Sequence, residues 1–306
     1  SCATQNDSEE SVKECFDILE SFSSSLVGKE LGLNENTFGW IASELPLNTE
    51  ANAAVDIAIH DLWAKREEKT LVDALGKKHQ SFDTSITIGV ASLEKTIEMA
   101  KKHIGNGFSI LKIKIGDCVE EDIERMKALF ELKPEKIKIR VDANRGYSKE
   151  ELIKFYEKTL HLGLELIEQP MEVDQNNEML YFPEEIRKIC VADESLQNFD
   201  DAVRLLKEPK PFGVFNIKLM KCGGVFAAKK IASLAEENGI ELMWGCFDES
   251  KISISAALHT ALSCENTRYI DLDGFFDLGW DLIEGGYRCE NGIMSAIERP
   301  GLGVFS

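Results

Sequence analysis

Polar residues recur at the ends of apolar, strand-like segments, about one strand plus one helix apart, and this period constrains the fold most. Six segments end in a polar residue and a seventh, in phase with them, ends in glycine; the terminal residues, 25 to 28 positions apart, are Lys114, Asp142, Glu168, Asp193, Lys218, Gly245 and Asp271. A strand, a loop, a helix and a second loop fill that length, so the period predicts repeated βα units. In a (β/α)-barrel the carboxyl ends of all strands meet at one mouth. We therefore expect these residues to share one site.

The chain divides near residue 80 into a helical part and an alternating part. Residues 8–26 predict a helix, Asn48 is typical of the N-cap of a second one, and no strand is evident before residue 80. From Asp83 onward eight strands alternate with amphipathic helices, and they read SITIG, ILKIKIG, IKIRVDAN, LELIEQP, ICVADES, VFNIKLMK, ELMWGCF and RYIDLDG. We expect an α/β protein with a capping domain at 1–80, a (β/α)-barrel catalytic domain at 81–274, and an irregular, glycine-rich segment at 275–306 that returns to the capping domain.

Composition narrows the class of partner. A net charge of −19 argues against nucleic acid or an anionic membrane as partner, and no apolar run reaches the roughly 18 residues of a spanning helix. None of the eight cysteines forms a C-x-x-C pair, which disfavours a zinc site or a disulfide framework. The first residues, SCATQNDSEE, do not resemble a signal peptide. We expect a cytoplasmic protein that acts on a small molecule.

Lys112 and Lys114 lie two positions apart on one expected strand, so their side chains point the same way. In a barrel strand that direction is inward, where two ammonium groups are costly unless the site uses them. Each ammonium would lower the pKa of the other, which suits a general base that works near neutral pH. The alternative, a solvated strand face, does not fit a central barrel strand.

Asp142, Glu168 and Asp193 end three consecutive strands. Three converging carboxylates would repel one another without a cation, and a hard divalent ion with oxygen ligands resolves the conflict. Mg²⁺ fits best because it keeps positions open for water and a substrate carboxylate, and we expect one per subunit. The alternative is that acids in βα loops serve as helix N-caps.

Lys114 ends the second strand and Lys218 the sixth, so the two lysines face each other across an eight-stranded barrel. The three carboxylates come from the strands between them. A substrate held there would meet one lysine on each face, the arrangement for a 1,1-proton transfer, which is an epimerisation or racemisation. Lys221 lies off this axis, and we expect it to be solvated or bonded to a loop.

The motifs LKIKIG, VDANRGYS, IEQP, VADES, NIKLMKCGG and WGCFDESK, in this order, resemble the muconate-cycloisomerase branch of the enolase superfamily. The dipeptide epimerases, typified by L-Ala-D/L-Glu epimerase, are the most similar group, and the resemblance covers essentially the whole chain. It implies an enolase-type barrel with a partial α+β capping domain whose N-terminal β-meander is missing here. It also implies a homo-oligomer that epimerises the C-terminal residue of a dipeptide at its α-carbon, through a metal-stabilised enediolate.

The same resemblance assigns roles to the residues of the barrel mouth. Lys114 and Lys218 would be the acid–base catalysts, and Lys112 an electrostatic partner of the enolate. The Mg²⁺ ligands would be Asp142, Glu168 and Asp193. Supporting contacts to these ligands would come from Asn144 and Glu194.

The subgroup and the substrate depend on weaker features. Asp271 and Asp273 form a D-x-D that resembles the clamp on a dipeptide's ammonium, although two aspartates that order a loop are an alternative. Gly245, Cys246 and Asp248 would line the substrate. Asp248 stands where glutamate-specific relatives carry an apolar residue, so it would repel a glutamate side chain unless it pairs with a lysine or arginine.

These features leave three classes of function open. We expect a dipeptide epimerase that prefers neutral or cationic dipeptides. An o-succinylbenzoate synthase or a muconate-type cycloisomerase is the enzymatic alternative, although the substrates of both lack an ammonium group. A catalytically silent barrel is the non-enzymatic alternative.

Overall fold

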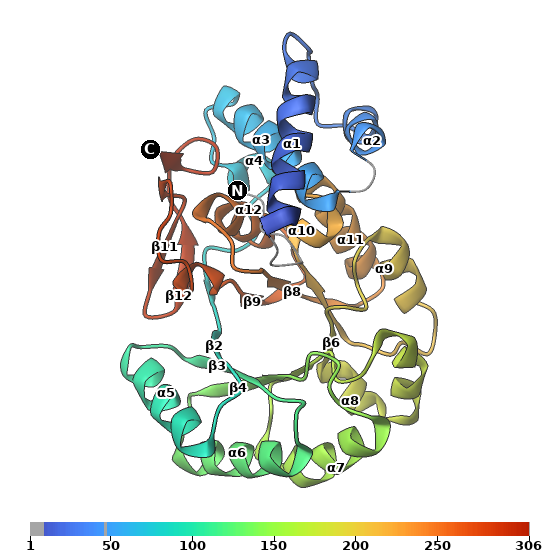
Figure 1. Cartoon of the computed structure of the whole chain (residues 1–306), viewed down its shortest axis with the longest axis vertical. Coiled ribbons are helices and arrows are strands. Elements are labelled where there is room, and N and C mark those ends of the chain that lie inside the picture. The colour runs from blue at the N-terminus through green and yellow to red at the C-terminus, as the bar shows by residue number, and fades with distance from the viewer. Residues whose placement is uncertain (1–8, 46–47, 306) are drawn as a thin grey trace.

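A computed structural model describes residues 9–45 and 48–305, and eight parallel strands form its central sheet in chain order (Figure 1). The strands are β2 (Ile86–Ile88), β3 (Ile110–Lys114), β4 (Lys138–Asp142), β5 (Leu166–Glu168), β6 (Cys190–Ala192), β7 (Val214–Ile217), β8 (Glu241–Gly245) and β9 (Thr267–Asp271). The sheet curls back on itself, because Thr84 bridges Ile270 and its hydroxyl accepts from Leu272 N at 2.9 Å. The expected eight-stranded barrel is confirmed.

Helices surround the barrel on its outer side (Figure 1). They are α5 (Leu93–Gly105), α6 (Val119–Leu132), α7 (Lys149–Thr159), α8 (Glu184–Ile189), α9 (Phe199–Leu205), α10 (Leu219–Cys222), α11 (Val225–Glu237) and α12 (Lys251–Ala261), with 3₁₀ turns at Leu160–Leu162, Val173–Tyr181 and Gly274–Phe276. Alternate strand residues such as Leu111, Ile113 and Val141 are fully buried beneath these helices. The residues between them in sequence, Lys112 and Arg140 among them, therefore point into the barrel. None of the described helices is long and apolar enough to cross a membrane.

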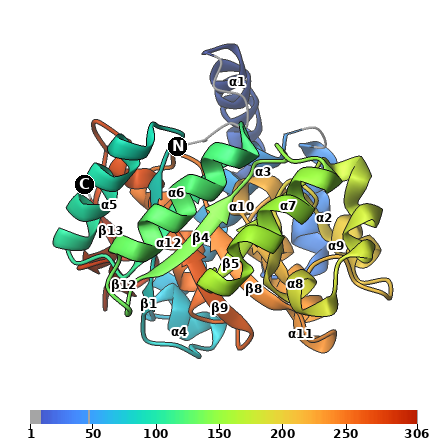
Figure 2. The same ribbon diagram turned by 90° about the horizontal axis from the view of Figure 1, so that it is seen from below.

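A helical lobe precedes the barrel and consists of α1 (Glu9–Leu26), α2 (Glu35–Glu44), α3 (Thr49–Arg66) and α4 (Leu71–Leu75). The N-cap prediction is confirmed, since the side chain of Asn48 accepts from Ala51 N at 2.7 Å. The predicted helix start at Ser8 lies outside the described residues. Figures 1 and 2 show that α1 projects away from the barrel. The lobe has its own apolar cluster around Phe38 and Ile41.

The lobe is joined to the barrel through a buried aspartate of α3. Asp56 accepts from Val225 N at 2.6 Å and from Phe226 N at 3.1 Å, so it caps the N-terminus of barrel helix α11. Gly224 precedes that helix with a φ of +118°, and a Cβ there would lie 2.5 Å from the Asp56 side chain. Since α11 follows the carboxyl end of β7, the lobe is docked on the mouth side of the barrel.

The segment after residue 274 contains strands, so the expectation that it is irregular is wrong. The strands are β10 (Glu284–Gly285), β11 (Tyr287–Glu290), β12 (Ile293–Ala296) and β13 (Val304–Phe305), and β12 also pairs with β1 (Phe82–Asp83). Asn291 and Gly292, both at positive φ, form the turn of the β11–β12 hairpin. Further along, Leu71 N donates to Gly301 O at 2.7 Å, which brings the end of the chain against α4.

Candidate functional site

The polar strand ends lie at one level of the barrel. Lys114 is paired in register with Asp142, and Asp142 is paired with Glu168. On the far side Gly245 is paired with Asp271. The period in the sequence thus becomes a ring of polar groups at the carboxyl ends of the strands.

Lys112 occupies the centre of this ring and is buried. Its Nζ lies 2.6 Å from Asp271, 2.7 Å from Glu168 and 3.0 Å from Asp142. Burial alone would lower the pKa of Lys112, yet the three carboxylates raise that pKa well above its ordinary value. The expectation that a neighbouring lysine lowers it is wrong, because these carboxylates outweigh the effect of Lys114. The three carboxylates thus favour the ammonium form of Lys112.

The pKa values of the carboxylates in contact with Lys112 are shifted in opposite directions. Burial and the neighbouring Asp142 raise the pKa of Glu168 to about 7. Burial would also raise the pKa of Asp142, but Lys112 and Lys114 lower it below its usual value. Glu168 therefore lies where the negative charge of the ring is least compensated, so that it binds a proton more readily than its neighbours.

Lys114 and Lys218 stand on opposite sides of the ring, as the second and sixth positions of the strand order require. Lys114 Nζ lies 2.7 Å from Asp142 and 2.6 Å from Asn144 Oδ1, and its side chain is 29% exposed. Lys218 Nζ lies 2.9 Å from Asp193 Oδ2 and 4.7 Å from the centre of the Phe247 ring. The two amines therefore border the same carboxylate ring from opposite faces.

Of the two alternatives expected for Lys221, the bond to a loop is the one found, since Asp193 follows the end of β6. Lys221 is not solvated: its side chain is 4% exposed and its Nζ lies 2.5 Å from Asp193 Oδ1. The short helix α10 brings about this placement, because three residues make almost one helical turn and direct the side chain back under the strand ends.

Two amides that hold the carboxylates were missed from the sequence. Asn216 Nδ2 donates to Glu168 Oε1 at 2.7 Å, and Gln169 Oε1 accepts from Asp193 N at 3.0 Å. A Cβ at Gly245 would lie 2.6 Å from Asn216 Oδ1, so this glycine gives the asparagine its space. Asn216 could have been found, since it precedes Lys218 by two positions and shares its strand face.

Asn144 and Glu194 lie beside the ring, as expected. Asn144 Nδ2 donates to Glu194 Oε1 at 3.3 Å. Burial, followed by the charge of Asp193, raises the pKa of Glu194. Its other oxygen, Oε2, is buried and makes no hydrogen bond to any described residue.

Asp271 ends β9 and Asp273 follows it, and both bond to residues in or next to β2. Asp271 accepts from Ser85 Oγ at 2.5 Å, and although burial opposes it, Lys112 lowers the pKa of Asp271 to about 2. Asp273 accepts from Thr87 N at 2.7 Å, and burial together with Asp271 raises its pKa to about 6. Asp273 is thus a second acidic group beside Asp271, whose charge Lys112 neutralises.

The loop after β8 carries the remaining predicted residues. Cys246 Sγ lies 3.5 Å from Asp271 O, and burial raises the pKa of this thiol well above its usual value. Asp248 is exposed on the same loop. Glu249, which follows it, is buried and accepts from Phe247 N at 2.9 Å.

The donor set fits a hard divalent cation. Among the residues that the structure describes, no three acidic, histidine or cysteine side chains are arranged around a metal position, because lysine ammoniums lie between the carboxylates. Six carboxylates nevertheless face four lysines here; they are Asp142, Glu168, Asp193, Glu194, Asp271 and Asp273, with Lys112, Lys114, Lys218 and Lys221. The raised pKa of Glu168 and the buried, unbonded oxygen of Glu194 are signs of that surplus. Oxygen ligands with surplus negative charge are what Mg²⁺ prefers.

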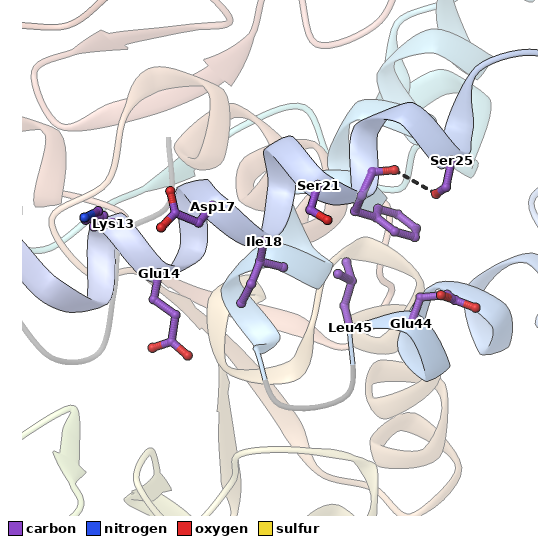
Figure 3. Close-up of a pocket in the computed structure, with 9 residues that line it drawn as sticks. Lys13, Glu14, Asp17, Ile18, Ser21, Ser25, Glu44 and Leu45 are labelled. Carbon is purple, nitrogen blue, oxygen red and sulfur yellow. Dashed lines mark hydrogen bonds between the residues drawn. The ribbon is translucent and has the colours of Figure 1, made fainter.

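A separate hollow lies in the helical lobe between α1 and α2 (Figure 3). It measures about 760 Å³, and its charged lining residues include Lys13, Glu14 and Asp17, which are exposed. It lacks the converging buried polar groups of the barrel mouth. We therefore place the site at the mouth.

Comparisons with known proteins agree on one group of relatives. The family model described as "Enolase C-terminal domain-like" matches residues 95–305. The L-Lys-D/L-Arg epimerase of Desulforapulum autotrophicum is 46% identical over 293 residues, which cover 96% of this chain and 77% of the relative. A protein of the same description from Methylococcus capsulatus is 44% identical over 279 residues, which cover 91% of this chain and 78% of that protein.

Solved structures give the same result. The dipeptide epimerase of Methylococcus capsulatus, complexed with Mg and the dipeptide L-Arg-D-Lys, has a TM-score of 0.94 at 42% identity, and the match covers 96% of this chain and 84% of that one. A substrate-liganded L-Ala-D/L-Glu epimerase from Bacillus subtilis has a TM-score of 0.89 at 32% identity, with coverage of 98% and 84%.

Proposed function

The chain belongs to the enolase superfamily, and from this premise we propose that it is a Mg²⁺-dependent dipeptide epimerase. The observation that carries the proposal is the pair Lys114 and Lys218, on opposed strands with carboxylates between them. The names of the relatives support the same class of reaction.

The chemistry is a proton transfer at the α-carbon of the C-terminal residue of the dipeptide. One of the two lysines starts neutral and takes the α-proton, while the other starts protonated and returns a proton to the opposite face. The roles exchange for the reverse direction. Lys112 is a fixed cation that stabilises the negative charge created when the proton leaves.

Asp142, Glu168 and Asp193 would hold Mg²⁺ in this proposal. The ion supplies a Lewis acid for the substrate carboxylate and so lowers the cost of removing a weakly acidic proton. Asn216 and Gln169 keep Glu168 and Asp193 in position. Asn144 and Glu194 border the same group.

The far end of the substrate would meet the two aspartates at the carboxyl end of β9. Asp271 and Asp273 would bind the dipeptide's ammonium, which suits Asp273 in particular because Lys112 already compensates Asp271. The loop from Gly245 to Asp248 would border the side chains. The lobe that Asp56 docks on the mouth side would act as the capping domain.

We propose cationic dipeptides, with lysine or arginine at the C-terminal position, as the substrate class. Two relatives above 40% identity are named L-Lys-D/L-Arg epimerases, and one structural relative binds L-Arg-D-Lys. The exposed Asp248 and the surplus of carboxylates at the mouth favour the same charge. Repulsion by the same groups would disfavour L-Ala-L-Glu.

The test is incubation with Mg²⁺ in D₂O, followed by mass spectrometry and chiral chromatography. L-Lys-L-Arg should gain one mass unit and yield its epimer, and L-Ala-L-Glu should react more slowly. The Lys114→Ala/Lys218→Ala double variant is the blank. N-succinyl-L-lysine, which lacks the N-terminal ammonium of a dipeptide, is the comparison substrate, and its faster turnover would contradict the assignment to dipeptides.

A further inference from the structure

Lys221 is a buried lysine that the proposed proton transfer does not use. It lies in α10, three residues after Lys218, and its side chain is 4% exposed. A buried ammonium is costly unless acceptors satisfy all of its donors, so its partners indicate its purpose.

The ammonium of Lys221 has three partners, and all are oxygens. It donates to Asp193 Oδ1 at 2.5 Å, to the backbone oxygen of Asp193 at 2.7 Å, and to the backbone oxygen of Asn216 at 3.2 Å. An ammonium has three N–H donors, so these bonds use them all. Lys221 keeps no donor for a substrate, and its nitrogen is fixed between the ends of β6 and β7.

The local fold separates Lys221 from Lys218. Both belong to one turn, since Lys221 N donates to Lys218 O at 3.1 Å. Gly223 and Gly224 close that turn with φ values of +91° and +118°, and both N–H groups donate to Leu219 O. Lys218 therefore borders the ring, while Lys221 lies behind Asp193.

The two carboxylate oxygens of Asp193 contact different lysines. Oδ1 bonds to Lys221, and Oδ2 faces Lys218 at 2.9 Å. The backbone of Asp193 is held on both sides, because its N–H donates to Gln169 at 3.0 Å and its oxygen accepts from Lys221. The carboxylate cannot rotate without losing its bond to Lys221.

We propose that Lys221 is a positioning residue that holds Asp193 as a one-oxygen ligand of Mg²⁺, an inference that rests on the proposed function. Mg²⁺ demands near-octahedral geometry, which a carboxylate that offers both oxygens to the ion distorts. Lys221 holds Oδ1 behind the ring, so Oδ2, which accepts from Lys218 at 2.9 Å on the side of the ring, is the oxygen that the ion would share. Groups that fix a metal ligand in this way typically contribute about 10- to 100-fold to metal affinity.

Titration calorimetry with MgCl₂ and no dipeptide tests the inference directly. Lys221→Met should weaken Mg²⁺ binding by about ten-fold or more. Lys221→Gln, whose amide still donates to Asp193, should weaken it less. Lys230→Gln is the matched control, because this lysine is 44% exposed and pairs with Glu35 on the surface, and it should bind Mg²⁺ as the wild type does.

Kinetics provides the second readout. Saturating Mg²⁺ should restore most of kcat to Lys221→Met, whereas a lysine that transfers protons could not be rescued in this way. A folded Lys221→Met with wild-type Mg²⁺ affinity, or with a kcat that Mg²⁺ does not restore, would overturn the inference. Should the methionine variant not fold, the same titration on Lys221→Gln decides.

The outcomes also separate this inference from the proposed function. A wild-type protein whose Mg²⁺ binding depends on Lys221, but which epimerises no dipeptide, contradicts the function alone. An active epimerase whose Mg²⁺ affinity is indifferent to Lys221 contradicts this inference alone. A wild-type protein that does not bind Mg²⁺ contradicts both.

Discussion

Two layers of charge lie inside the same barrel, and they are built on different principles. The mouth layer consists of the six carboxylates and four lysines named above, and Lys112, paired in register with Arg140, belongs to it through its side chain. The lower layer, two residues down the strands, centres on Arg140, which is 3% exposed. Arg140 Nε donates to Glu165 at 2.7 Å and its Nη1 donates to Ile270 O at 2.8 Å.

The difference is one of charge balance. In the lower layer the carboxylate is fully compensated: Glu165 pairs with Arg140 and with Lys138, each at 2.7 Å, and burial notwithstanding, the two cations hold the pKa of Glu165 below its usual value. The mouth layer has more carboxylates than its lysines neutralise, and the pKa of Glu168 rises to about 7. A buried network whose positive and negative charges balance serves the stability of the fold, whereas a network with excess negative charge favours the binding of a cation.

Metal removal should affect only the mouth layer and should have the largest effect. EDTA should abolish epimerisation and Mg²⁺ should restore it, because the substrate carboxylate then lacks its Lewis acid. Asp193→Asn should also abolish activity with little loss of folding. Chiral chromatography and circular dichroism measure the two properties, and full activity in a metal-free preparation would contradict the site.

Removal of either opposed lysine should reduce epimerisation by about 10³-fold, as for other acid–base groups. Lys218→Ala should still exchange the α-proton of one epimer in D₂O, through Lys114, and Lys114→Ala should exchange that of the other. Proton NMR of each pure epimer measures the exchange. Interconversion of epimers at the wild-type rate by either variant would refute the two-base arrangement.

A substitution in the lower layer should instead lower the unfolding free energy. Arg140→Met removes a buried guanidinium that donates to Ile270 O, and Glu165 keeps its ion pair with Lys138, so we expect a loss of about 1–3 kcal/mol of unfolding free energy. The folded variant should keep a kcat close to that of the wild type. Urea denaturation and steady-state kinetics measure the two effects. A large loss of kcat without a loss of stability would remove the distinction between the layers.

The metal-free protein should show opposite pH responses in the two layers. Glu168 has a folded pKa of about 7, above its unfolded value, so it stabilises the fold below about pH 4.5 and loses that effect as pH rises to 7. The loss amounts to up to about 3 kcal/mol. Glu165 has a lowered pKa, so its contribution is present above about pH 4.5 and falls in acid.

Urea denaturation with EDTA from pH 4 to 8 checks these signs. In Glu168→Gln the loss of stability between pH 4.5 and 7 should be smaller than in the wild type. In the wild type, added Mg²⁺ should reverse that loss. An unchanged slope in Glu168→Gln would mean that the surplus charge lies on another group.

The smallest effect concerns the rim of the mouth layer. Asp248→Asn should shift the ratio of kcat/KM for Ala-Lys over Ala-Glu towards Ala-Glu by several-fold, since an exposed charge contributes about 1 kcal/mol at most. Ala-Ala and Ala-Val should change little. Asp200→Asn, an exposed acid of α9, is the control. A wild-type preference for Ala-Glu would refute the role given to Asp248.

The sequence predicted the ring of polar strand ends because that pattern is local. Each strand carries its own apolar run and terminal polar residue, so Lys114 and Asp142 could be placed without any distant contact. The N-cap at Asn48 was readable for the same reason. The hairpin at Asn291–Gly292 was also readable, since this pair is a strong turn signal, but it was overlooked.

Properties that depend on distant partners were beyond the sequence. The charge state of Lys112 depends on Asp271, which lies 159 positions away. The burial of Lys221 depends on a four-residue helix, too short to leave a periodic pattern. Spacing predicts which groups share a mouth, but it does not predict which of them are paired.

The aspartate cap between the lobe and the barrel has a consequence for how the protein assembles. Helix α11 begins at Val225, four residues after Lys221, and its first N–H groups are satisfied by Asp56 of the lobe. A barrel without the lobe would leave that helix end open and the preceding turn unsupported. The turn that carries Lys218 and Lys221 therefore reaches its final shape only after the helical lobe has docked on the barrel. The site thus forms only when both the lobe and the barrel have folded.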